Sequence, residues 1–87
     1  MVYEEIVLKN AEGLHARPAT EIAKSASKYE CMIKMNINGN EYNAKSVLNI
    51  MSAGIKDKTP IKIICDGKDE GKALTEMINI FKSNSLV

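Results

Sequence analysis

Two residues near the start of the chain carry side chains that suit phosphate chemistry. His15 is the only histidine, and Arg17, two residues later, is the only arginine among twelve basic residues. An imidazole titrates near neutrality, with an unperturbed pKa of about 6.5, and its neutral form is a nucleophile. A guanidinium presents a rigid fork of donors to anionic oxygens. Pro18 favours the first turn of a helix, whose free N–H groups attract anions, so the three residues together predict a phosphate-handling site.

His15 and Arg17 also have simpler interpretations, as a solvated loop histidine and a solvated cation in a first helical turn. A cation in that position is unfavourable by a few tenths of a kcal/mol, up to about 1, which is expected where function selects the residue. We therefore expect an imidazole nitrogen to attack a phosphoryl group, and Arg17 to orient and partly neutralise that group. The backbone N–H groups of Ala16 and Arg17 are further expected donors to the phosphate.

Length, charge and hydropathy exclude several other classes of protein. Eighty-seven residues with a net charge of +1 indicate one small domain over residues 1–87, and not a nucleic-acid binder, which needs a clustered basic excess. No apolar run approaches membrane length and no signal sequence precedes the first strand, so we expect a cytoplasmic protein without membrane insertion. Cys31 and Cys65 lack metal-ligand spacing, and we expect both to be reduced, apolar, strand-borne residues. No metal and no cofactor are expected.

The hydrophobic pattern predicts seven elements in the order β-α-β-β-α-β-α. Strands are expected over residues 3–9, 32–37 and 41–44, and from residue 60 onward. A helix is expected over residues 16–27, with an apolar stripe made of Ala19, Ile22, Ala23 and Ala26. Ser46 is expected to cap a short second helix, and Asp69 the last one. Four strands with one apolar face each indicate an α+β fold, an antiparallel sheet covered on one face by helices.

Two stretches of sequence resemble a known family. Residues 13–19 read Gly-Leu-His-Ala-Arg-Pro-Ala, and residues 45–54 read Lys-Ser-Val-Leu-Asn-Ile-Met-Ser-Ala-Gly. They resemble the active-site and regulatory-serine segments of HPr, the histidine-containing phosphocarrier of the bacterial phosphoenolpyruvate:sugar phosphotransferase system. The resemblance runs nearly the whole length and implies an open-faced sandwich of four antiparallel strands under three helices.

The same resemblance implies an activity and its partners. His15 is expected to accept a phosphoryl group from enzyme I and to pass it to sugar-specific enzyme IIA domains, as a carrier in a relay rather than a stand-alone enzyme. The family uses the Nδ1 nitrogen, whereas the residues alone leave the choice of nitrogen open. A free monomer is expected, because one docking patch needs no symmetric partner.

Ser46 has a structural and a regulatory interpretation, and the two are compatible. The first is a helix N-cap. The second comes from the resemblance, which implies phosphorylation by a bifunctional HPr kinase/phosphorylase and binding of that form by a catabolite-control transcription regulator. A phosphate adds a charge of about −1.5 to −2, which a helix N-terminus accepts without unfolding. The added charge would repel a donor enzyme with an acidic docking face.

Apolar residues after Ser46 exceed what so short a helix can bury. The simple interpretation of Val47, Leu48 and Met51 is core packing, but Leu48 is surplus to one helical stripe. We expect these three residues to form an exposed patch that docks partners, with a polar and basic rim supplied by Thr20, Lys24 and Lys45.

Three positions depart from the usual pattern of the family. Asn49 stands where glycine is common in Gram-positive members, Ala53 replaces a usual leucine, and Glu21 places an acid on the first helix. These departures bear on docking and partner choice rather than on phosphoryl chemistry. A second hypothesis is an HPr-like regulatory module that acts through Ser46 phosphorylation without sugar phosphotransfer. Known paralogues of that kind lack the histidine, so the presence of His15 favours the carrier; a third, unrelated α+β adaptor fits neither motif.

Overall fold

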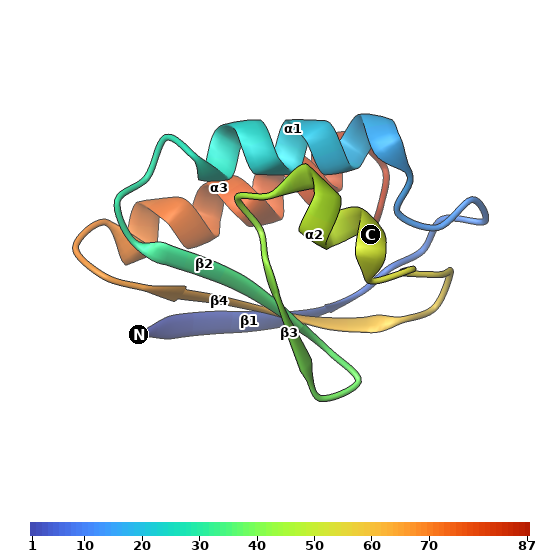
Figure 1. The fold of residues 1–87 in the computed structure, drawn as a ribbon, viewed down its shortest axis with the longest axis horizontal. Helices are drawn as coiled ribbons and strands as arrows, with labels where there is room; N and C mark the ends of the chain where they lie inside the picture. Colours follow the sequence, from blue (N-terminus) through green and yellow to red (C-terminus); the bar gives the residue numbers. More distant parts are fainter.

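The computed structural model describes all 87 residues and contains the seven expected elements in the expected order. The elements are β1 (Val2–Val7), α1 (Ala16–Ala26), β2 (Met32–Ile37), β3 (Asn40–Asn43), α2 (Val47–Ser52), β4 (Pro60–Asp66) and α3 (Glu70–Ser83). The four strands form one antiparallel sheet in the order β1-β4-β2-β3. Figure 1 shows the three helices on one face of this sheet, while the other face is bare. The predicted α+β architecture is confirmed.

The alternation of the central strands directs their apolar residues toward the helices. Ile33, Met35 and Ile37 of β2 are buried, as predicted, and so are Ile61, Ile63 and Cys65 of β4. The hairpin between β2 and β3 turns at Asn38 and Gly39, both with positive φ (54° and 83°), which is the geometry that a two-residue turn requires. Each central strand therefore supplies one layer of the core.

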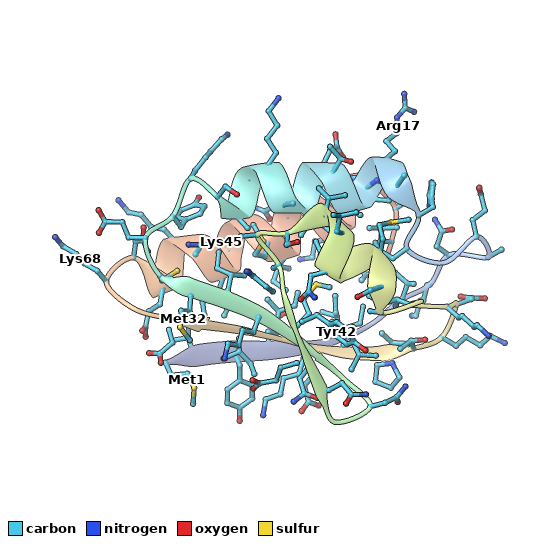
Figure 2. All side chains as sticks on the ribbon, in the orientation of Figure 1. Met1, Arg17, Met32, Tyr42, Lys45 and Lys68 are labelled. Atoms are coloured by element: carbon cyan, nitrogen blue, oxygen red, sulfur yellow. The ribbon has the colours of Figure 1, made fainter.

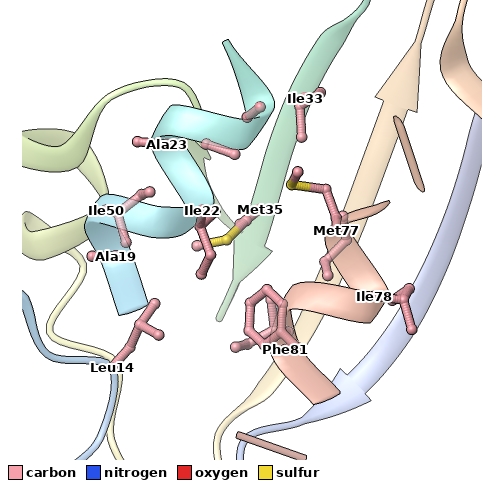
Figure 3. Close-up of a cluster of buried hydrophobic side chains, with 14 of the residues drawn as sticks. Leu14, Ala19, Ile22, Ala23, Ile33, Met35, Ile50, Met77, Ile78 and Phe81 are labelled. Atoms are coloured by element: carbon pink, nitrogen blue, oxygen red, sulfur yellow. The ribbon is translucent and has the colours of Figure 1, made fainter. Parts of the chain in front are cut away.

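The helices complete the core from above. The predicted stripe of α1 is confirmed, since Ala19, Ile22, Ala23 and Ala26 are all buried. The close-up in Figure 3 shows Ile22 of α1 facing Met35 of β2, with Met77 and Phe81 of α3 beside them. The small alanines let α1 pack closely on its neighbours. The N-terminus of α1, just before which His15 was expected, is thus held against the core.

Two details differ from the sequence-based expectations. β1 ends at Val7, two residues early, because the next N–H groups leave the strand ladder: that of Leu8 donates to Thr59 and that of Lys9 to Leu86. Asp69 occupies the N-cap position of α3 but makes no side-chain cap. Its carboxylate instead accepts hydrogen bonds from the backbone N–H groups at positions 30 and 31, both at 2.9 Å. The capping prediction for Asp69 was therefore wrong, because two donors from the adjacent loop compete successfully for the carboxylate.

The two cysteines are buried and free, as expected, although Cys31 precedes β2 instead of lying on it. Burial raises the pKa of the Cys31 thiol to about 11 and that of the Cys65 thiol to about 12. Both groups are thus held as uncharged thiols at neutral pH, and they serve as apolar core residues. None of the three helices is long and apolar enough to cross a bilayer.

Candidate functional site

His15 is the N-cap residue of α1. Its backbone is extended (φ −94°, ψ −174°), and its carbonyl oxygen accepts the first helical hydrogen bond, from the N–H of Ala19 at 3.1 Å. The imidazole is half-buried and makes no side-chain cap. Its Nδ1 lies 3.3 Å from the carbonyl oxygen of Gly13, at the long end for a hydrogen bond. The ring is therefore oriented by one weak contact and remains open to an incoming group.

The first turn of α1 offers unsatisfied donors beside His15. The N–H groups of Ala16 and Arg17 donate to no acceptor within the protein, and Pro18 has no N–H. No acidic residue lies in this turn to neutralise the positive end of the helix dipole. The structure thus leaves open the two donors that the sequence analysis assigned to phosphate.

Arg17 is the cation of this turn, and nothing in the protein holds it. Its side chain is exposed and takes part in no hydrogen bond or salt bridge within the chain. Figure 2 shows it extending from α1 away from the body of the molecule. The guanidinium is therefore free to reach an anion that binds at the helix N-terminus.

The loop that carries His15 is fixed by the segment that follows α2. Gly13 has a φ of 71°, and a Cβ added to it would lie 2.5 Å from the carbonyl oxygen of Ile55. That same oxygen accepts a hydrogen bond at 2.9 Å from the N–H of Leu14, whose side chain is buried. Only glycine combines the left-handed backbone with this close approach. The peptide before His15 is thus held in place by the hydrogen bond of Leu14 and by the close approach of Gly13 to Ile55.

Two further anchors of the loop have no signal in the sequence. The carboxylate of Asp57 accepts a hydrogen bond at 3.0 Å from the N–H of Asn10. The carbonyl oxygen of Leu86 accepts one at 2.7 Å from the N–H of Lys9, and the Leu86 side chain is fully buried. Both partners are more than forty residues away in the sequence, so no local pattern predicts them.

Ser46 is the N-cap of α2, as predicted. Its hydroxyl oxygen accepts a hydrogen bond at 3.1 Å from the N–H of Asn49. The neighbouring Lys45 differs from expectation, because its ammonium donates at 2.7 Å to the carbonyl oxygen of Tyr29. The charge of Lys45 is thus tied to the loop after α1 and does not project from the surface as an unrestrained rim residue.

The apolar residues of α2 divide between the core and the surface. Leu48 is 83% exposed and Met51 is 40% exposed, whereas Val47 packs partly against the core. Thr20 and Lys24, the rim residues expected on α1, are both exposed, and the Thr20 hydroxyl donates to the carbonyl of Ala16 at 2.8 Å. Of the departures noted above, Glu21 is exposed and Ala53 packs partly against the core. An exposed pair, Leu48 and Met51, thus remains on α2, hereafter the α2 patch.

The fold and the site together define a small α+β domain that presents its only histidine at the N-terminus of its first helix. Residues 2–83 match a family model described as the HPr component phosphorylation site of the phosphotransferase system (PTS). The phosphocarrier protein HPr of Mycoplasma pneumoniae is 37% identical over 84 residues, which are 95% of this chain and 96% of that protein. The chain therefore belongs to the HPr family of phosphocarrier proteins.

Solved structures of the family agree with the fold. The histidine-containing phosphocarrier protein of a mycoplasma matches with a TM-score of 0.97 at 34% identity, over 99% of this chain and 98% of that chain. HPr of Thermoanaerobacter tengcongensis matches with a TM-score of 0.89 at 35% identity, over 95% and 93% of the two chains. The latter protein has also been solved as a dimer. The resemblance stated from the two motifs, and the open-faced sandwich that it implied, are confirmed.

Proposed function

We propose that His15 carries a phosphoryl group from enzyme I to sugar-specific enzyme IIA domains. The observation that supports this most directly is the open first turn of α1, where a half-buried imidazole adjoins two N–H groups without acceptors. Helix N-termini with free N–H groups bind phosphate, because donors and dipole act together. A charge-neutral histidine in this position is a nucleophile with its phosphate site already formed.

The transfer consists of one bond broken and one bond formed. The unprotonated imidazole nitrogen attacks the phosphorus of the phosphorylated donor, a P–N bond to His15 forms, and the bond to the donor breaks. The phosphoryl oxygens then accept hydrogen bonds from the N–H groups of Ala16 and Arg17, and the guanidinium offsets their negative charge. In the transfer to the acceptor, a group of the acceptor attacks the phosphorus and the P–N bond to His15 breaks. The chain has no second histidine to activate water beside the first, which suits a carrier better than a hydrolase.

The identity of the attacking nitrogen depends on the contact with Gly13. In the observed orientation a proton on Nδ1 would donate to the Gly13 carbonyl oxygen, 3.3 Å away, leaving Nε2 unprotonated. Attack through Nδ1, as in the family, then requires the proton to move to Nε2 and the ring to leave this contact. Because the contact is long, its loss costs little.

Docking is assigned to the surface next to the site. The α2 patch is apolar and exposed, and α2 packs on α1 (Figure 1). Exposed apolar side chains beside a reactive group are typical anchors of a transient interface. Val47, Thr20 and Lys24 complete the proposed surface, with Lys45 at its margin. The carrier acts as one domain, as a monomer and in the cytoplasm.

Regulation is assigned to Ser46. Its hydroxyl caps α2 within the same helix that bears the α2 patch. A phosphate there would add negative charge next to the docking surface and would slow association with an acidic donor. The proposed agents are an HPr kinase/phosphorylase and a catabolite-control transcription regulator that binds the serine-phosphorylated form.

The test is phosphorylation by phosphoenolpyruvate and purified enzyme I, followed by addition of an enzyme IIA domain. Wild-type protein should gain one acid-labile phosphate and lose it to the acceptor, and His15→Ala should gain none. The coupling between ³¹P and ¹⁵N in labelled protein identifies the nitrogen. The control is phosphorylation, by the same enzyme I, of the HPr from its own organism. If enzyme I is active in that control and folded wild-type protein still accepts no phosphate, the proposal is overturned.

A further inference from the structure

Asn49 joins α2 to the edge of the sheet. Its Oδ1 accepts a hydrogen bond at 2.6 Å from the backbone N–H of Asn43, the last residue of β3. Its own backbone N–H donates to the Ser46 hydroxyl at 3.1 Å. The side chain and the main chain of Asn49 thus hold two different partners, one on each side of the turn between β3 and α2.

The bond to Asn43 satisfies a donor that the sheet leaves unpaired. β3 is an edge strand, because the sheet order is β1-β4-β2-β3. An edge strand presents N–H groups without a neighbouring strand to accept them. The donor is a backbone N–H, so the oxygen of the Asn49 amide, and not its nitrogen, must face Asn43. Asn43 in turn fixes the connecting turn, since its side-chain oxygen accepts from the N–H of Lys45 at 2.9 Å.

This contact fixes the rotation of α2 about its own axis. Core packing holds α2 along one side, through fully buried Ile50 and partly buried Val47. A helix of six residues held along one line can roll about that line. Asn49 precedes Ile50 by one residue and so projects about 100° away around the helix. A second contact at that angle prevents the roll, and the direction in which Leu48 and Met51 face is then set.

We propose that Asn49 is a positioning residue for partner docking: its contact with Asn43 fixes the orientation of the α2 patch. The inference rests on the proposed docking role of that patch and goes beyond it, by naming the group that sets its geometry. A glycine at position 49 could not make this contact. Members of the family with glycine there must orient α2 by other means, and partners adapted to them should bind this chain differently.

The experiment compares Asn49→Leu, which removes the acceptor at similar size, with Asn49→Asp, which keeps an oxygen for the Asn43 N–H. Asn79→Leu, on an exposed position of α3, is the matched control for an added apolar side chain. The first measurement is hydrogen exchange of the Asn43 amide, which needs no partner protein. Exchange should be slow in wild type and Asn49→Asp and at least tenfold faster in Asn49→Leu, with melting temperatures recorded for all variants.

The second measurement is steady-state phosphorylation by enzyme I. The KM for Asn49→Leu should rise about threefold to tenfold, the range expected for one lost hydrogen bond, with kcat unchanged because His15 is untouched. In about 1 M salt, which screens the charge of the new aspartate, Asn49→Asp should have the same KM as wild type measured in the same buffer. Asn79→Leu should match wild type.

The possible failures are distinguishable. If wild-type protein accepts no phosphate, the proposed function is overturned. Hydrogen exchange of the Asn43 amide then tests only the contact between Asn49 and Asn43. Unchanged exchange of Asn43 in Asn49→Leu would show that the contact does not hold α2. Faster exchange with an unchanged KM, or a KM that Asn49→Asp fails to restore, would remove the positioning role. An equal fall in kcat for Asn49→Leu and Asn49→Asp would also count against it.

Discussion

The backbone N–H of Leu14 donates a hydrogen bond at 2.9 Å to the carbonyl oxygen of Ile55. The peptide immediately before His15 therefore rests on the segment that follows α2, forty-one residues further along the chain. The same carbonyl oxygen leaves no room for a side chain at Gly13. The imidazole of His15 and α2 are thus connected through one short stretch of backbone.

Gly13→Ala should disturb this connection. The new Cβ would meet the Ile55 oxygen at 2.5 Å, and the φ of 71° is unfavourable for alanine. We expect a loss of about 1–3 kcal/mol in the free energy of unfolding, with slower phosphoryl transfer. Gly71→Ala is the control, because Gly71 lies in α3 with open space around it and should be neutral or stabilised by about 1 kcal/mol. Chemical denaturation and transfer kinetics check both, and equal stability of the two variants would contradict the account.

Arg17→Gln should affect stability and activity in opposite directions. Arg17 makes no contact within the protein and its charge opposes the helix dipole, so its removal should stabilise the fold by a few tenths of a kcal/mol. Loss of a charge-assisted interaction with the phosphoryl group should lower kcat/KM about tenfold to a hundredfold. Arg17→Lys should fall between, and Lys28→Gln, two residues beyond the end of the same helix, should leave transfer unchanged. A wild-type rate for Arg17→Gln would remove the role in transfer.

Leu48→Ala should weaken docking without weakening the fold. Leu48 is 83% exposed, so truncation removes almost no buried area. An anchor residue of an interface, however, costs 1 kcal/mol or more when truncated, which corresponds to about a fivefold or larger rise in the KM for enzyme I. Met32→Ala, at an exposed position on β2, is the matched control. If Leu48→Ala and Met32→Ala behave alike in kinetics, the α2 patch is not the docking site.

Ser46 substitutions separate the structural from the regulatory role. Ser46→Ala removes the acceptor of the Asn49 N–H and should destabilise the protein by about 1 kcal/mol. Ser46→Asp keeps an acceptor at the cap and should retain stability. The aspartate should nevertheless slow phosphorylation of His15, because it places a negative charge near the donor. Thermal unfolding and initial rates with enzyme I measure the two effects. A wild-type rate for Ser46→Asp would count against regulation by charge.

Asp69 should make stability depend on pH in the acid range. Hydrogen bonds from the backbone N–H groups of Glu30 and Cys31 lower the pKa of Asp69 from 3.8 to about 2. Because the folded pKa lies below the ordinary value, the stabilisation is present above pH 3.8 and is lost as the pH falls toward 2. Asp69→Asn should lower the melting temperature at pH 7, and the difference from wild type should shrink across that interval. A constant difference between pH 7 and pH 2 would refute this assignment.

The local features of the sequence predicted the elements well. The stripe of α1 and the alternation of β2 and β4 depend on the period of the side chains, which any short window reveals. The N-cap at Ser46 was equally local, because its partner Asn49 is three residues away. The placement of His15 and Arg17 at one helix end followed from Pro18 and from the spacing alone.

What the sequence could not predict depends on contacts between distant segments. The carboxylate of Asp69 does not cap α3, because it accepts hydrogen bonds from two backbone N–H groups in the loop before β2. The ammonium of Lys45, expected at the surface, donates a hydrogen bond to the carbonyl oxygen of Tyr29 and so connects two segments of the fold. The supports of the His15 loop, above all Ile55 and Leu86, carry side chains of no special chemistry, and only the fold gives them their role.

The order of the strands has a consequence for how the molecule comes into being. β1 pairs with β4 alone, so Val2 finds its partner Cys65 only after three-quarters of the polypeptide exists. β4 also pairs with β2, which makes this late strand one of the two central strands of the sheet. Such non-local pairing delays folding, because long loops must close first. While a nascent chain has not yet reached Ile55, the N–H of Leu14 lacks the carbonyl oxygen to which it donates in the folded protein. The loop that carries His15 should therefore gain its support only after Ile55 and β4 have been synthesised.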